Sequence, residues 1–194
     1  MALDKRAKRT QNWLYEALIN LMEQKNYREI TITELAEKAD IARPTFYHNY
    51  NSIDDILINR MDEAFGQYID SVRKDLKKNL GDVDRTMDAI VRQIFVVWQG
   101  NEKLFRLLVK AGLTHKMVER FNDYVTTLQS EAVPEFHSSV MPQRYLTQFF
   151  AAGTVQFLTV WIEEGMVLSV DEAGKIYKPM MKLLIETSRK YNEG

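Results

Sequence analysis

The chain has 194 residues, of which 45% are hydrophobic, and its 26 Lys and Arg against 27 Asp and Glu leave a net charge of −1. This length and apolar content support one large or two small cores and exclude a disordered chain, and the lack of cysteine excludes disulfides and thiolate metal sites. The longest nearly apolar run, 149–162, is shorter than the roughly 20 residues that cross a bilayer, and no signal peptide pattern is present, so we expect a cytoplasmic protein.

Basic residues gather at the start of the chain. Residues 1–10 hold four basic side chains and one acidic one, namely Lys5, Arg6, Lys8, Arg9 and Asp4. Because the net charge excludes a basic coat over the whole chain, any contact with nucleic acid must be local. By itself this segment is equally typical of a solvated terminus, but beside a DNA-reading motif it favours an arm that reaches phosphates or a minor groove.

The first predicted helix begins at Asp4 or Thr10 and ends at Gln24. Its apolar side chains recur at the spacing of one helix face, at Leu14, Ala17, Leu18 and Leu21. Arg28 follows in a loop, where it reaches either a phosphate or a neighbouring carboxylate. We expect the helix itself to serve packing.

Residues 33–50 predict two short helices joined by a tight turn, which is a helix-turn-helix. Thr33 is the expected N-cap of the first helix, and the apolar pattern breaks at Asp40. The second helix must begin near Ala42, because Pro44 is tolerated only in a first turn. The residues expected to point outward are those that a helix in a DNA major groove needs, namely Arg43, Pro44, Thr45, Tyr47 and His48.

A long helix is predicted from Ser52 to about Asn79, with Ser52 and Asp55 at the spacing of a capping box. At about 1.5 Å per residue it is a rod about 40 Å long, which begins at the helix-turn-helix and ends elsewhere. Gly81 and Asp82 then break the pattern. We therefore place one domain at 1–51 and a second at 52–194.

Only helical patterns follow in the second domain, so the predicted fold class is all-α. Helices are expected at 87–100, 102–111 and 114–128, then a loop at 135–141 that contains His137, then helices at 143–164 and 169–190. The helix at 143–164 is apolar nearly all round, which is typical of a helix buried on every side. One subunit of this size cannot bury every side of this helix, so part of it is expected to pack against a second partner.

The order of these elements resembles the TetR family of bacterial transcription regulators. The resemblance rests on the run Ile-Thr-Ile-Thr-Glu-Leu-Ala-Glu-Lys-Ala, the run Arg-Pro-Thr-Phe-Tyr-His-Asn-Tyr and the Ser-capped fourth helix, and it covers residues 8–60. Two positions depart from the family pattern: Ile53 stands where a phosphate-binding lysine is common, and Ala42 where a capping serine is common. The second domain is loosely similar to regulators of dihydroxyacetone kinase operons.

The resemblance implies a ligand-responsive repressor that binds a palindromic operator as a homodimer and is released by a small effector. Besides the outward residues of the second short helix, it implies DNA contacts at Thr33, Asn51, Arg28, Lys5, Arg6, Lys8 and Arg9. It implies an effector pocket in the second domain, lined by Phe95, Trp98, Phe105, Met117, Phe121, Tyr124, Phe149 and Trp161. For the dimer interface formed by the last two helices we expect Ala152, Gly153, Gln156, Phe157, Val160, Met180 and Leu184.

The residues also bear on two other classes of function. An enzyme is disfavoured, because the sequence has no Glu-x-x-His, phosphate loop or Gly-x-Ser-x-Gly motif, and no cofactor or metal is expected. His115 and Glu119 are spaced as half a metal site, but a solvated pair is the simpler interpretation. The alternative that stays open is a coactivator of the same fold, which acts through a protein partner without binding DNA itself.

Overall fold

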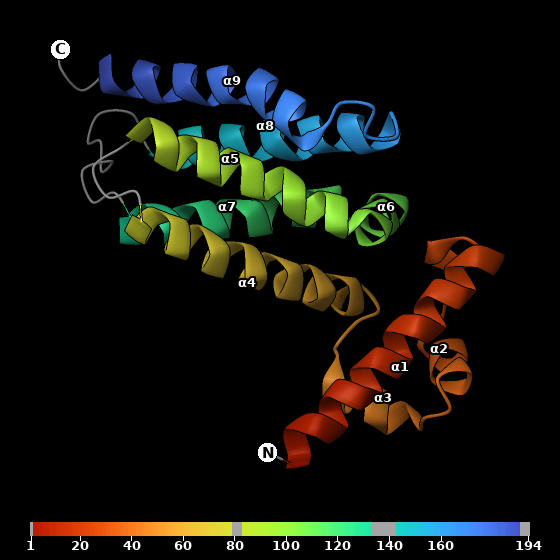
Figure 1. Ribbon diagram of the computed structural model, residues 1–194. Coiled ribbons are helices and arrows are strands. Elements are labelled where there is room, and N and C mark those ends of the chain that lie inside the picture. Colours follow the sequence, from red (N-terminus) through yellow and green to blue (C-terminus); the bar gives the residue numbers. More distant parts are fainter. Residues whose placement is uncertain (1, 79–82, 133–142, 191–194) are drawn as a thin grey trace.

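The computed structural model describes residues 2–78, 83–132 and 143–190, and these residues are helical without any strand, as predicted (Figure 1). The predicted loop at 135–141, with His137, lies outside them. The helices are α1 Ala2–Gln24, the 3₁₀ turn η1 Tyr27–Glu29, α2 Ile32–Lys38, α3 Arg43–Asn49, α4 Asp54–Lys78, α5 Val83–Gly100, α6 Glu102–Lys110, α7 Thr114–Ala132, α8 Gln143–Glu163 and α9 Val170–Lys190.

Figure 1 shows α1–α3 packed together at one end of the molecule and α5–α9 stacked as a bundle at the other, with α4 running from the first group into the second. One continuous hydrophobic cluster extends from Leu14 and Phe46 through Met61 to Met181. The two groups of helices therefore share α4 as a common core element. None of the helices in the described ranges combines the length and apolar content that a bilayer crossing requires.

Local sequence explains where these helices begin and end. The Ser52–Asp55 capping box is confirmed, because the Asp55 carboxylate accepts the Ser52 N–H at 2.9 Å and the Asp55 N–H donates to Ser52 Oγ at 3.3 Å. A second box, Ser169 with Glu172, begins α9. Asn101 precedes α6, but its amide donates to the Val97 carbonyl at 2.8 Å and caps nothing.

The predicted N-cap of α2 was wrong. Thr31 holds that position: its hydroxyl accepts the Glu34 N–H at 3.2 Å, and the Glu34 carboxylate accepts the Thr31 N–H at 2.9 Å. Only Thr31 stands three residues before a glutamate, which is the spacing that a capping box needs. Thr33 lies in the first turn of α2, exposed to solvent.

The turn between α2 and α3 lies where the sequence predicts it. Asp40 adopts a left-handed conformation with φ of 53°, which Asp tolerates better than most residues. The Ile41 N–H then donates to the Ala36 carbonyl at 3.0 Å, which closes the end of α2. Because Ile41 is partly buried against the core, it fixes the angle at which α3 leaves the turn.

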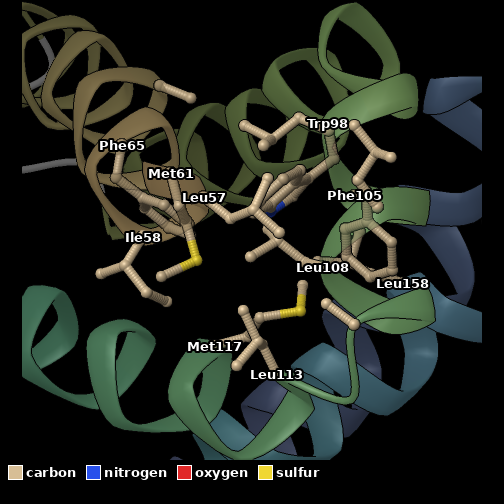
Figure 2. Packing of buried hydrophobic residues seen from close by; sticks show 14 of the residues in the cluster. Leu57, Ile58, Met61, Phe65, Trp98, Phe105, Leu108, Leu113, Met117 and Leu158 are labelled. Atoms are coloured by element: carbon tan, nitrogen blue, oxygen red, sulfur yellow. The ribbon is translucent and has the colours of Figure 1, made fainter. Parts of the chain in front are cut away.

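The bundle core is made of interlocking large side chains. Figure 2 shows side chains from α4, α5, α6, α7 and α8 that meet in one cluster, among them Leu57, Trp98, Phe105, Leu108, Met117 and Leu158. Trp98 and Phe105 pack edge to face with ring centroids 4.9 Å apart, and Phe65 of α4 packs on Trp98 at 5.3 Å. The rings thereby tie α4 to α5 and α6.

Candidate nucleic-acid interface

Helix α3 presents a row of side chains that packing leaves free. Arg43, Pro44 and His48 are exposed, and Tyr47 is 50% exposed, whereas Phe46 is 0% exposed. A residue every 100° around the helix explains the split, because the core side takes Phe46 and leaves its neighbours outside. Four of the five predicted reading residues therefore lie together on one open face, and Thr45 is half-buried beside them.

Phe46 and Tyr50 anchor α3. The Phe46 ring packs edge to face on Tyr47 at 5.4 Å and lies 6.3 Å from the Tyr50 ring. Tyr50 is 6% exposed, donates to Asn59 of α4 at 3.3 Å, and has its pKa raised to about 12 by burial. Ala42, the N-cap residue of α3, has no side chain that could cap the helix. The packing of these two rings therefore stabilises α3 where a capping hydroxyl is missing.

The N-terminus of α4 lies beside α3, and its acidic residues are engaged within the chain. Asp55 accepts the N–H groups of Asn51 and Ser52, both at 2.9 Å, and Asp54 accepts the Tyr27 hydroxyl. Ile53 is partly buried against the core. The side chain of Asn51 is exposed and available for an outside contact. Two carboxylates at this helix end oppose a phosphate, so the neighbouring elements must supply the positive charge.

The basic segment is helical, not an extended arm, because α1 begins at Ala2. Lys5, Arg6 and Arg9 are exposed on it. Lys8 forms an ion pair with Glu63 of α4. Burial of Glu63 raises its pKa, but the Lys8 hydrogen bond and the charge of Arg60 outweigh this and hold the pKa below its ordinary value.

Arg28 does not lie with the other predicted DNA contacts. Its Nη2 atom is 4.0 Å from where a Cβ on Gly112 would lie, so the side chain reaches the turn between α6 and α7. Lys110, at the end of α6, donates to the Met22 carbonyl at the end of α1 at 2.6 Å. Arg28 therefore lies near the turn where α6 meets the end of α1, which a prediction from its loop position alone does not anticipate.

The predicted pocket residues divide into two aromatic groups. In the first group, Trp98, Phe121 and Tyr124 pack on Phe65, and the Tyr124 ring stacks on it at 4.4 Å. Phe105 joins this group through Trp98. Phe95 and Trp161 form the second group with Phe157 and Tyr177, at centroid distances of 5.1 to 5.7 Å from Phe95. Met117 is buried next to the first group. A bound molecule would have to part these rings.

Two residues of α8 lie on the opposite side of the helix from the one that the sequence predicts. Phe149, predicted to line the pocket, is 66% exposed. Phe157, predicted at the dimer interface, packs inward on Phe95 at 5.6 Å and Tyr177 at 5.4 Å. Because α8 is apolar all round, its pattern does not indicate which face meets the bundle.

Helices α8 and α9 each carry an exposed apolar face. On α8 this face holds Tyr145, Phe149, Ala152, Gly153, Gln156 and Val160, which recur at helical spacing. On α9 it holds Ile176 and Met180, which are 45% and 53% exposed. The side chain of Leu184 lies outside the described part of the structure. Five of the predicted interface residues are therefore accessible on these two helices.

Polar residues on one turn of α4, which no sequence motif marks as functional, contact elements from both ends of the molecule. Asn59 accepts from Tyr50, the residue that follows α3, and Glu63 pairs with Lys8 of α1. On the bundle side, Asp62 accepts the Tyr124 hydroxyl of α7 at 2.7 Å and pairs with Arg120 at 3.2 Å. The sequence feature that could have revealed these contacts is a group of four polar residues, at positions 59, 60, 62 and 63, within the otherwise apolar segment 56–65.

Sequence models of known protein families match both the helix-turn-helix end of the chain and the helical bundle. The sequence model of bacterial regulatory proteins of the tetR family matches residues 14–59, which hold the helix-turn-helix. The model of a transcriptional regulator C-terminal region matches residues 85–183, about half of the chain. No curated protein matches the sequence significantly.

Solved structures share the fold at low sequence identity. The structure of Lin0861 from Listeria innocua aligns with a TM-score of 0.73 at 16% identity, covering 92% of each chain. The fatty acid degradation regulator FadR from Bacillus halodurans aligns at 0.52 and 17% identity, over 91% of this chain and 94% of its own. The dihydroxyacetone kinase operon activator DhaS aligns at 0.50 and 16% identity, over 94% and 98%. With both of its parts matched by models of transcription regulators, the chain belongs to the TetR family of bacterial regulatory proteins.

Proposed function

We propose that this regulator binds an operator in double-stranded DNA through α3, with residues 1–51 as the DNA-binding domain and 52–194 as the effector and dimerisation domain. The observation that carries the proposal is the open face of α3, where a guanidinium, an imidazole and a phenol project from a helix anchored by Phe46. Arg donates to guanine in a bidentate manner, and the apolar parts of Pro and Tyr suit the thymine methyl group. Thr33, Asn51 and three cations of α1, namely Lys5, Arg6 and Arg9, position the DNA backbone.

The regulator is proposed to act as a homodimer paired through α8 and α9. The exposed stripe of α8 and the apolar residues of α9 support this, because a symmetric contact covers the same face of both subunits at once. Pairing sets the separation of the two α3 helices, which must match half-sites about 34 Å apart, or a multiple of that distance, in the major groove. The expected operator is therefore palindromic.

A small effector is proposed to bind among the two aromatic groups and to release the DNA, which makes the protein a repressor. Support comes from α4, whose Asp62 holds Tyr124 of the first aromatic group while Asn59 and Glu63 of the same turn hold α3 and α1. A ligand that parts Tyr124 from Phe65 shifts α4, and α4 shifts α3. Coupling of about 1 to 3 kcal/mol suffices for a switch, and operator DNA must weaken effector binding equally.

The test is selection of bound duplexes from a random pool by the purified protein, followed by gel shifts with the selected duplex and with fragments of its own upstream region. We expect enrichment of a palindrome with two equal half-sites. Failure to enrich any sequence, together with no binding to duplex DNA at low salt, would refute the proposal. Retention of a second protein in place of DNA would support the coactivator alternative.

A further inference from the structure

Arg9 has an environment unlike that of any other exposed cation at the start of α1. Its guanidinium carbon lies 4.9 Å from the centroid of the Trp13 ring, one helical turn further on. Trp13 is 45% exposed, and Arg9 is exposed beside it. The indole therefore supports one face of the guanidinium, while the N–H groups at its edge point to solvent.

Lys8, the preceding residue, is engaged on a different side of α1. It pairs with Glu63, which also pairs with Arg60 at 3.0 Å. Arg60 in turn lies over the Tyr15 ring at 4.7 Å and donates to Asn12. The α1 residues in this group are spaced four and three apart, so they form the face of α1 that meets α4. Arg9 is about 100° around the helix from Lys8 and outside that face.

The two cations therefore differ in what a phosphate would gain from them. A guanidinium stacked on a ring is already ordered and presents paired N–H donors that fit two phosphate oxygens. Lys8 would have to leave a carboxylate before it could bind another anion. The N-terminal part of α1 also lies next to α3, at the end of the molecule farthest from the α5–α9 bundle (Figure 1). A phosphate of DNA held by α3 would approach this end.

We propose that Arg9, braced by Trp13, is a phosphate-binding residue of the DNA interface, and that Lys8 is a structural link between α1 and α4 that makes no DNA contact. This inference rests on the proposed DNA binding. It corrects the expectation that all four cations of the basic segment act alike.

The salt dependence of DNA binding separates the two cations, because each phosphate neutralised by the protein adds about 0.9 to the slope of log K against log salt. We expect Arg9→Gln to reduce this slope by about 0.9 on the selected duplex and on a random-sequence duplex alike. We expect Lys8→Gln, the matched control on the adjacent residue, to leave the slope unchanged. Circular dichroism of each variant checks that α1 has folded.

Trp13→Leu tests the bracing role. The variant keeps the charge of Arg9, so the salt slope should stay near the wild-type value, while the affinity falls several-fold because Arg9 is no longer ordered. Trp13 is also an exposed fluorophore, whereas Trp98 and Trp161 are buried. Addition of duplex DNA should change the tryptophan emission of the wild-type protein by more than that of the Trp13→Leu variant, because the remaining Trp98 and Trp161 are buried.

Three results would overturn the inference: an unchanged slope in Arg9→Gln, an equal loss of slope in Lys8→Gln, or wild-type affinity in Trp13→Leu. If the wild-type protein binds no duplex at low salt, the proposed DNA binding itself fails, and this inference fails with it. If the wild-type protein binds with a slope that Arg9 does not influence, only the inference fails.

Discussion

Arg43 is the side chain of α3 that is best suited to read a base, since it is exposed at the start of the helix and its planar fork matches guanine. We expect Arg43→Ala to cost about 1 to 3 kcal/mol on the selected duplex and to relax the preference at one base pair. Fluorescence anisotropy on the selected duplex and on its single-base variants measures both effects. Wild-type affinity together with wild-type selectivity would remove Arg43 from the interface.

We expect the contact between Glu34 of α2 and Lys25, the residue that follows α1, to be sensitive to acid. Its hydrogen bond from Lys25, followed by those from Thr31, lowers the pKa of Glu34 to about 2 from an ordinary value of 4.5. A lowered pKa means that the ionised carboxylate stabilises the fold above pH 4.5, and that this contribution is lost as the pH falls toward 2. The melting temperature of Glu34→Gln should therefore lie below that of the wild type at neutral pH and approach it in acid.

Glu37→Gln, on the same helix, is the control for Glu34→Gln. Glu37 is exposed and lies outside the Thr31 capping box, so its variant should follow the wild-type melting temperature at every pH. A difference between wild type and Glu34→Gln that does not depend on pH would show that the carboxylate charge has no role in capping α2.

Replacement of glycine by alanine should have opposite effects on stability at the end of a helix and inside one. Gly112 ends α6 with φ of 74°, and the following N–H, of Leu113, closes the turn onto Leu108 at 3.0 Å. A side chain in that conformation costs roughly 1 to 2 kcal/mol. We expect Gly112→Ala to lower the free energy of unfolding by about that amount, measured by urea denaturation.

Gly66 is the matched position, because it lies inside α4 where an added Cβ meets nothing within 4 Å. Gly66→Ala should raise the free energy of unfolding by about 1 kcal/mol, since alanine favours the helix over glycine by that amount. Stabilisation by both variants would contradict the left-handed turn at Gly112. Because that turn seats α6 against α1 through Lys110, the Gly112 variant should also expose the end of α1 to hydrogen exchange.

The assembled molecule is expected to be a dimer that depends on Phe149. Phe149 is exposed on the apolar face of α8, so Phe149→Glu should leave the subunit folded and prevent pairing. Sedimentation at micromolar concentration should give about twice 22.7 kDa for the wild type and 22.7 kDa for the variant. A wild-type protein that sediments as a monomer would refute the pairing through α8 and α9.

Phe157→Glu distinguishes loss of pairing from loss of folding. The Phe157 ring contacts Phe95 and Tyr177, so a carboxylate there is placed against an apolar core and should lower the melting temperature of the subunit itself. Phe149→Glu should leave the melting of the monomer nearly unchanged. If both variants behaved alike, α8 would not have distinct inner and outer faces.

The helices and the helix-turn-helix could be predicted from the sequence because their causes are local. Apolar spacing, the Pro44 position and the Ser-x-x-Asp and Ser-x-x-Glu boxes all act within about one or two helical turns. The open face of α3 follows from the same rule, since one large buried ring leaves its neighbours outside. These features place the helix-turn-helix, and the side chains proposed to read DNA, without any knowledge of the rest of the chain.

Contacts between distant segments could not be predicted in this way. Lys8 and Arg9 are adjacent and both basic, yet they have different partners. Lys8 pairs with Glu63, which is 55 residues further along the chain, whereas Arg9 packs on Trp13. The exposure of Phe149 and the inward packing of Phe157 could not be predicted for the same reason, because an all-apolar helix carries no periodic signal that shows which side is buried. Which side of such a helix is buried is decided by the shape and area of the surfaces it meets, and those exist only once the bundle has assembled.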